Sequence, residues 1–94
     1  MTLEEFVFSI QIGEEIELFI NEHAYFLQPD DTRSSASWDK DTPPYPYTVV
    51  YEVDTTNQEN VKEIFRGTTE EVLSFPFANE FTLKNDFELF VYVF

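Results

Sequence analysis

Alternation of residue types near the start of the chain constrains the fold most. Large aliphatic residues occupy every second position of residues 16–20, the period-2 pattern of a strand with one buried face. Residues 21–23 are a short polar break that begins with Asn21, and Asn tolerates the left-handed backbone of a tight turn. Residues 24–28, of which the first four are apolar or aromatic, follow as a second strand. The pattern predicts a β-hairpin over residues 13–28, against which we expect the other elements to pack.

Two capping boxes predict where helices begin. A Thr followed three residues later by a Glu occurs at residues 2–5 and again at residues 68–71. In this arrangement each side chain accepts a hydrogen bond from the backbone N–H of the other residue. The first box predicts a helix over residues 3–12, with Gly13 as its left-handed C-terminal cap. The second predicts a short helix that ends before Pro76, because proline cannot continue a helix.

Strands are also expected in the second half of the chain. Residues 47–54 alternate and are rich in Val and Tyr, and residues 61–65 follow a polar turn, so the two runs predict an antiparallel pair. The C-terminus carries two patterns. Its large apolar residues are spaced four, three and four apart, which is helical, but residues 90–94 are strand-forming types. We expect a helix over residues 83–90, and a strand is the alternative for the last residues.

Together these elements predict a single α+β domain over residues 1–94, with a small antiparallel sheet of about four strands flanked by short helices. Residues 29–46 read as a loop longer than most in compact domains, and we expect this loop to be the most mobile or partner-dependent segment. It contains Trp38, the single Trp of the chain. Trp38 is either an exposed contact residue or a side chain that folds back to close one end of the core.

Charge is the dominant feature of the composition. The chain has 19 Asp and Glu against five Lys and Arg, for a net charge of −14. Residues 1–32 contain eight of the acids and no Lys or Arg. A surface of this kind repels nucleic acid and anionic lipid, favours a basic partner and accelerates encounter with one. The alternative is that the acidic residues only keep the protein soluble.

The residue types provide little for catalysis. Without Cys there is no disulfide, thiolate zinc site or cysteine nucleophile, which fits a reducing cytoplasm. The only His, His23, falls in the predicted hairpin turn. The acidic pairs at residues 30–31 and 39–41 lack the spacing and the glycine of a calcium loop, and the two Gly are too far apart to cradle a phosphate. No signal peptide or membrane-spanning run is visible. We therefore expect no enzyme activity, cofactor, metal site or membrane contact.

Two later segments extend the pattern of helix, Gly and hairpin seen at the start. Residues 65–73 read Phe-Arg-Gly-Thr-Thr-Glu-Glu-Val-Leu, and residues 82–87 read Thr-Leu-Lys-Asn-Asp-Phe. Over about half of its length the chain thus resembles a group of small uncharacterised Firmicutes and phage proteins. Those proteins carry an aromatic-x-Ser/Thr-Pro-Glu-Glu-Leu-Leu segment before a final helix, and Thr69 stands here in place of the Pro. The resemblance implies an α+β fold and a mobile-element origin, and it transfers no catalytic residue.

These observations predict an acidic inhibitor of a basic nucleic-acid-binding protein. Glu15 and Glu17 are expected on the same face of one strand, roughly 7 Å apart, and such an array imitates a phosphate backbone. The leading candidate is a phage-encoded anti-CRISPR protein that blocks an RNA-guided nuclease in the host cytoplasm. The alternatives are an immunity protein against a nuclease toxin, or a phage or bacterial domain whose acidic surface is merely solvated. We expect a monomer or weak dimer that binds no nucleic acid directly. The residues expected to bind the partner are Glu4, Glu5, Glu14, Glu15, Glu17, Glu22, Trp38, Tyr45 and Tyr47.

Overall fold

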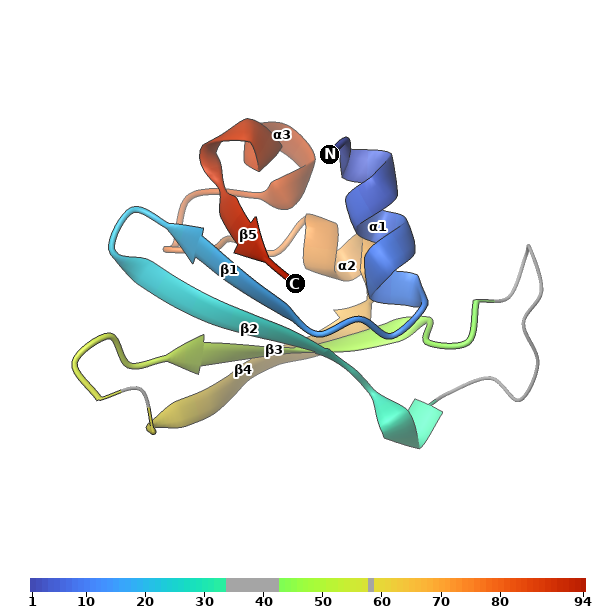
Figure 1. Ribbon diagram of the computed structural model, residues 1–94, viewed down its shortest axis with the longest axis horizontal. Helices are drawn as coiled ribbons and strands as arrows, with labels where there is room; N and C mark the ends of the chain where they lie inside the picture. The colour runs from blue at the N-terminus through green and yellow to red at the C-terminus, as the bar shows by residue number, and fades with distance from the viewer. Residues whose placement is uncertain (34–42, 58) are drawn as a thin grey trace.

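A computed structural model describes residues 1–33, 43–57 and 59–94 of the chain. Within these residues five strands form one antiparallel sheet in the order β4-β3-β2-β1-β5, and three short helices lie on one side of it (Figure 1). The predicted α+β class is confirmed, with five strands in place of about four. The strands are β1 (Ile16–Ile20), β2 (His23–Pro29), β3 (Tyr47–Val53), β4 (Val61–Thr68) and β5 (Val91–Val93). The α-helices are α1 (Leu3–Gln11), α2 (Thr69–Leu73) and α3 (Leu83–Asp86), and 3-10 turns occur at Asp31–Arg33 and Phe87–Leu89.

The predicted hairpin is present as β1 and β2. Ile20 pairs with His23, so the turn consists of two residues, and its first residue, Asn21, has a φ of 53°. The first position of this turn is left-handed, a conformation that Asn tolerates better than most residues. The assignment of His23 to the turn was wrong, since His23 is the first residue of β2. The strand also runs one residue further than expected, to Pro29.

Helix α1 begins and ends as its sequence predicts. The Thr2 hydroxyl accepts a hydrogen bond from the backbone N–H of Glu5, and the Glu5 carboxylate accepts one from the backbone N–H of Thr2. At the other end Gly13 has a φ of 93°, and the N–H groups of Gly13 and Glu14 donate to the carbonyls of Ile10 and Ser9. This is the hydrogen-bond pattern of a glycine-terminated helix. The helix therefore stops at a defined point and directs the chain into β1.

The second capping box also forms, and the C-terminus changes structure twice. Thr68 caps α2 through reciprocal hydrogen bonds with Glu71. Thr82 caps α3, but the α-helix ends at Asp86 and continues only as a 3-10 turn. The helix predicted to reach residue 90 is therefore too long. Phe90 is extended and buried, and β5 then pairs with the outer edge of β1, where its β-branched residues complete the sheet.

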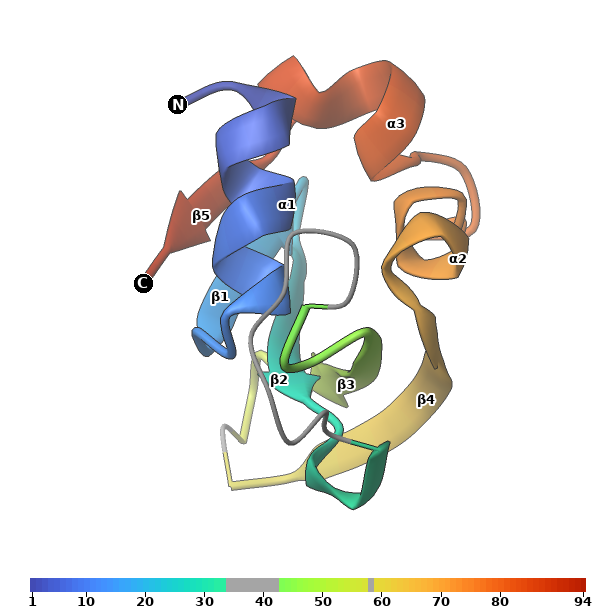
Figure 2. The same cartoon turned by 90° about the vertical axis from the view of Figure 1, so that its right-hand side faces the viewer.

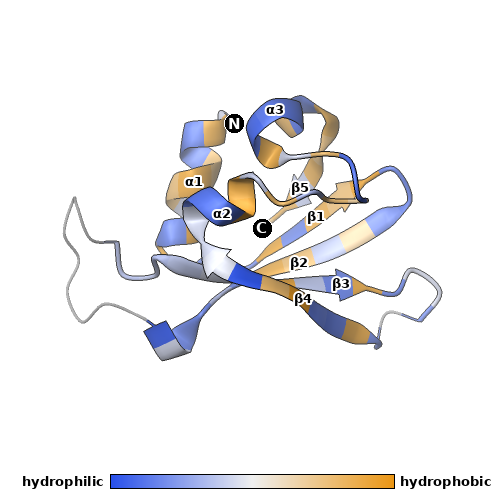
Figure 3. Ribbon diagram, turned by 180° about the vertical axis from the view of Figure 1, so that it is seen from behind, coloured by the Kyte–Doolittle hydropathy of each residue, from blue (hydrophilic) through white to orange (hydrophobic). Residues whose placement is uncertain are grey.

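The core lies between the sheet and the three helices. Side chains from β1, β2 and β3 contact Phe6 and Ile10 of α1, Val72 of α2 and Leu83 of α3. In Figure 2, which is turned by 90° from Figure 1, the helices again lie together on one side of the strands. Figure 3 shows hydrophobic and hydrophilic residues alternating along α1 and β4, as expected of elements with one buried face. We call the side of the sheet that bears the helices the covered face and the opposite side the open face.

The connection from β2 to β3 is described only at its two ends. Asp30 is 2% exposed, and its Oδ1 accepts hydrogen bonds from the backbone N–H and the hydroxyl of Thr32. Its Oδ2 lies 2.9 Å from Nη1 of Arg66 on β4. The hydrogen bonds from Thr32, with the Arg66 charge, lower the pKa of Asp30 despite its burial. Residues 34–42, with Trp38 and the predicted mobility of this loop, lie outside the described residues.

Candidate binding surface

Two rows of side chains cross the open face at right angles to the strands. Residues that pair directly across antiparallel strands project to the same face, with Cβ atoms about 4.5–5.5 Å apart. The first row contains only apolar residues and spans all five strands, and we call it the apolar row. From β5 to β4 it consists of Val91, Phe19, Ala24, Val53 and Val61. The neighbouring row, which we call the mixed row, consists of Val93, Glu17, Phe26, Tyr51 and Glu63.

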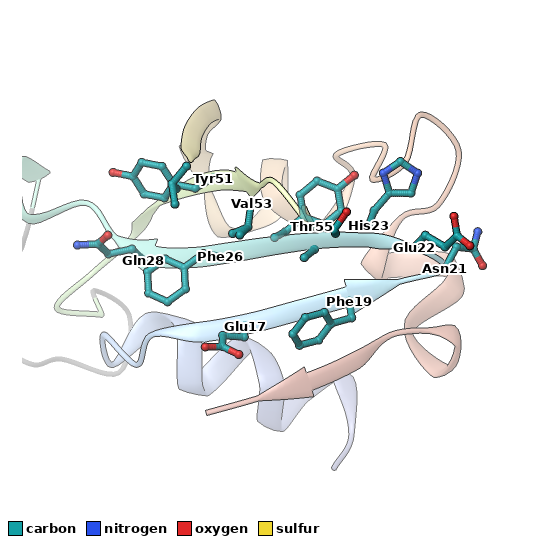
Figure 4. A pocket seen from close by; sticks show the side chains of 13 residues that line it. Glu17, Phe19, Asn21, Glu22, His23, Phe26, Gln28, Tyr51, Val53 and Thr55 are labelled. Carbon is teal, nitrogen blue, oxygen red and sulfur yellow. The ribbon is translucent and has the colours of Figure 1, made fainter. Parts of the chain in front are cut away.

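A hollow of about 630 Å³ lies over the hairpin and β3 on this face. Ala24 is the smallest residue of the apolar row, and larger side chains from both rows line the hollow around it, among them Phe19, Phe26 and Tyr51 (Figure 4). The rings of Phe26 and Tyr51 are in contact, with centroids 6.4 Å apart. These side chains are half-buried in the isolated chain. The hollow can therefore accept one large apolar side chain from outside.

Exposed apolar side chains end the apolar row at both edges of the sheet and the mixed row at the β5 edge. Val61 is 50% exposed, Val91 is 62% exposed and Val93 is 50% exposed. None of the open-face residues belongs to the core that the helices cover. Exposed apolar side chains that neighbour one another across paired strands make this face a candidate site of interaction.

Carboxylates border the hollow. Glu17 lies in the mixed row and Glu22 in the β1–β2 turn, so they stand on opposite sides of the apolar row, and both line the hollow (Figure 4). Within the described parts of the chain neither carboxylate forms an ion pair. Glu63 differs, because its Oε1 lies 2.8 Å from Nη2 of Arg66. The β1–β2 side of the hollow is therefore the more negative one.

Four of the other predicted partner-binding acids lie at opposite ends of α1. Glu4 and Glu5 lie in the first turn of α1, whereas Glu14 and Glu15 follow its last turn, about 13 Å away for a helix of this length. Glu5 is also engaged in its cap, and the hydrogen bonds from Thr2 lower its pKa. β1 begins at Ile16, so of the two acids that were predicted to share a strand only Glu17 lies within it, and Glu15 lies one residue before it.

Two of the three predicted aromatic anchors, Tyr45 and Tyr47, have contacts within the described part of the chain. The Tyr45 ring lies over Gly13 so closely that a Cβ added there would be 2.6 Å from a ring carbon. The backbone N–H of Tyr45 also donates to the carbonyl of Gln11. Tyr47 lies beneath the guanidinium of Arg33, at 4.2 Å from the ring centroid. Both tyrosines are half-buried and hold the chain entering β3 against the end of α1 and the 3-10 turn.

Phe19, Ala24, Phe26 and Val53 were missing from the predicted site. The available indication was Phe19, an aromatic residue at a position of β1 that the alternation assigns to the outer face. One exposed aromatic residue is unremarkable alone. It becomes informative only when the strand register brings other apolar residues beside it.

We also looked among the described residues for side chains that could act in catalysis or bind a metal ion. His23 is exposed, and its ring stacks on Tyr25 with centroids 6.3 Å apart. The described side chains contain no cluster of three or more His, Asp and Glu residues suited to hold a metal ion. None of the described helices has the length and apolarity needed to cross a membrane.

Comparisons with models of known families, with curated proteins and with solved structures found no match to this chain. The resemblance to small Firmicutes and phage proteins therefore stays a prediction.

Proposed function

We propose that this protein acts by binding a basic protein, and that it inhibits a nucleic-acid-binding protein by covering the positively charged groove of that partner. The observation that carries the proposal is the excess of carboxylates that have no cation beside them. In residues 1–33, 43–57 and 59–94, the only ion pairs are those of Arg66 with Asp30 and Glu63. The remaining negative charge is available to attract a cationic surface.

Electrostatics and apolar contact have separate roles in this proposal. Dispersed carboxylates accelerate encounter with a basic surface and make the association depend on salt. Individual exposed charges add little affinity, on the order of 1 kcal/mol each or less. Affinity that survives physiological salt needs apolar surface that becomes buried on binding. The open face, with its hollow beside Glu17 and Glu22, combines both features.

The proposal is tested by cleavage assays with purified RNA-guided nucleases. Increasing amounts of the protein should abolish DNA cleavage at about one molecule per nuclease, and the association rate should fall steeply as salt rises. Nuclease toxins form a parallel arm of the assay, and inhibition only in that arm would identify the protein as an immunity protein. Absence of inhibition in both arms at low salt, with the protein in excess, would contradict the proposal.

A matched pair of charge reversals separates a specific surface from net charge. The triple variant Glu14→Lys, Glu15→Lys and Glu17→Lys changes the net charge by the same amount as Glu70→Lys, Glu80→Lys and Glu88→Lys, at three exposed acids that do not line the hollow. The first triple should slow association with the nuclease much more than the second, because Glu17 lies beside the hollow and the other two acids precede its strand. Equal effects of the two triples would mean that only total charge matters.

A further inference from the structure

We infer that the open face is a docking groove for a positively charged amphipathic helix of the partner, with the apolar row as its floor. The inference rests on the proposed function in one respect, that the partner is basic. It adds the surface that binds and the kind of segment that binds there.

The dimensions of the apolar row fit a short helix. Five strands at a spacing of about 4.8 Å place Val91 and Val61 roughly 19 Å apart. A helix of about 13 residues has this length, and an apolar stripe along it presents three or four side chains to the row. Binding of an amphipathic helix in an apolar groove is a recurring mode of recognition. The hollow over Ala24 would take the largest of these side chains.

The bordering charges select a basic helix. Glu22 stands on one side of the apolar row and Glu17 on the other, so a helix lying on the row has a carboxylate along each flank. Lys or Arg residues beside the apolar stripe of the helix would meet these carboxylates while their aliphatic stems cover the edges of the row. Electrostatic complementarity of this kind favours a basic helix and rejects acidic segments.

The same charges disfavour two other occupants. A second copy of this chain would bring another net charge of −14 against the first. An anionic membrane surface would likewise repel the carboxylates beside the hollow. The outer edge of β5 is open to an added strand, but β5 has only three residues, which leaves few backbone groups for pairing.

The inference is tested with a synthetic peptide of about 14 residues in which Leu and Lys alternate with helical periodicity. A peptide of the same composition in scrambled order removes the apolar stripe, and a Leu/Glu peptide reverses the charge. Calorimetry should detect binding of the Leu/Lys helix, at least about tenfold tighter than the scrambled peptide, and no binding of the Leu/Glu peptide. Equal binding of the helical and scrambled Leu/Lys peptides would overturn the inference.

Two substitutions locate the binding site. Ala24→Arg fills the hollow and adds a positive charge, so it should weaken binding of the Leu/Lys peptide at least about tenfold. Leu89→Arg makes the same charge change at a residue that is 57% exposed and lies outside the sheet, and it should leave affinity within about twofold. Ala24→Leu fills the hollow without a charge and serves if Ala24→Arg unfolds. Unchanged affinity in a folded Ala24 variant would also overturn the inference, as would backbone NMR shifts confined to β5.

Failure of this inference can be distinguished from failure of the proposed function. If Ala24→Arg still inhibits the nuclease while the Glu14, Glu15 and Glu17 reversals do not, the proposed function holds and the partner docks elsewhere. If no basic nucleic-acid-binding protein is inhibited but the Leu/Lys peptide binds at Ala24, the groove is real and the proposed target class is wrong.

Discussion

Leu18 and Phe19 are adjacent in β1 and show how differently the two faces of the sheet are used. Leu18 is fully buried beneath the helices, whereas Phe19 is half-buried on the open face. Both are large and apolar, so residue type does not separate them. What separates them is the second layer, because α1, α2 and α3 all contribute to the core on the same side. An apolar residue of this sheet thus serves stability on one face and is available for binding on the other.

The largest effect on the free energy of unfolding is expected from a substitution on the covered face. Leu18→Ala should lower the free energy of unfolding by about 3 kcal/mol, because it leaves a cavity in the core. Phe19→Ala should lower it by about 1 kcal/mol or less, because its side chain is already partly solvated. Urea unfolding followed by circular dichroism measures both. Similar losses in the two variants would mean that the open face is part of the core.

Two tyrosines, one on each face of the sheet, allow the same comparison with smaller expected losses of unfolding free energy. Tyr25 is 3% exposed on the covered face, and its hydroxyl accepts a hydrogen bond of 2.8 Å from the backbone N–H of Ala78. Tyr25→Phe should therefore cost about 1.5 kcal/mol of unfolding free energy, since it leaves that N–H without a partner. Tyr51→Phe, in the mixed row of the open face, should cost about 0.5 kcal/mol or less. Thermal unfolding of the two variants in parallel gives the result, and a larger loss for Tyr51→Phe would count against this view.

Asp30 should make the stability of the fold depend on pH. Its pKa is lowered in the folded state, chiefly by the hydrogen bonds from Thr32 and also by Arg66, so the ionised carboxylate stabilises the fold. The stabilisation is present above the unfolded-state pKa of about 4 and is lost as the pH falls through the lower folded-state value. Asp30→Asn should lower the unfolding free energy at pH 7 by about 1 kcal/mol, allowing for the partial exposure of Arg66.

Urea unfolding of wild type and Asp30→Asn from pH 7 to pH 2.5 checks this prediction. The difference between the two proteins should be constant down to about pH 5 and should shrink below about pH 4. A difference that grows on acidification would show that the sign is wrong.

The smallest effect is expected for one charge beside the hollow. Glu17→Gln should leave the melting temperature unchanged, because the carboxylate is exposed and unpaired in the described parts of the chain. It should weaken binding of the Leu/Lys peptide about twofold to fivefold at low salt and less at high salt. Calorimetry at two salt concentrations measures this, with Glu80→Gln as the control. The same weakening in the control would remove Glu17 from the binding site.

Local sequence patterns predicted much of this fold. The main error, at the C-terminus, arose because strand pairing between distant residues cannot be read from a local pattern. The capping boxes at Thr2 and Thr68 were recognisable because each depends on residues three apart. The hairpin followed from the alternation in β1. In contrast, β5 is a strand because β1, more than seventy positions earlier, offers it an open edge. The helical spacing of the last residues was real but persists only as far as the 3-10 turn that ends at Leu89.

The candidate site was less predictable than the fold. Sequence pattern identified Glu17 and Glu22 by charge but also selected Tyr45, which instead packs on Gly13. The apolar row could not be read from any one segment, because its members come from five strands and meet only through their register. Alternation also does not say which face a second layer will cover.

The central claim is that the open face is the binding surface, and methyl NMR with a soluble paramagnetic reagent tests it most directly. Without peptide, the reagent should relax the methyl groups of Val53 and Val61 strongly and those of Val50 and Val72 weakly, because only the second pair is buried in the core. Saturation with the Leu/Lys peptide should then protect Val53 and Val61 and leave Val50 and Val72 unchanged. If Val53 and Val61 remain as accessible with the peptide bound as without it, the open face is not the surface that binds.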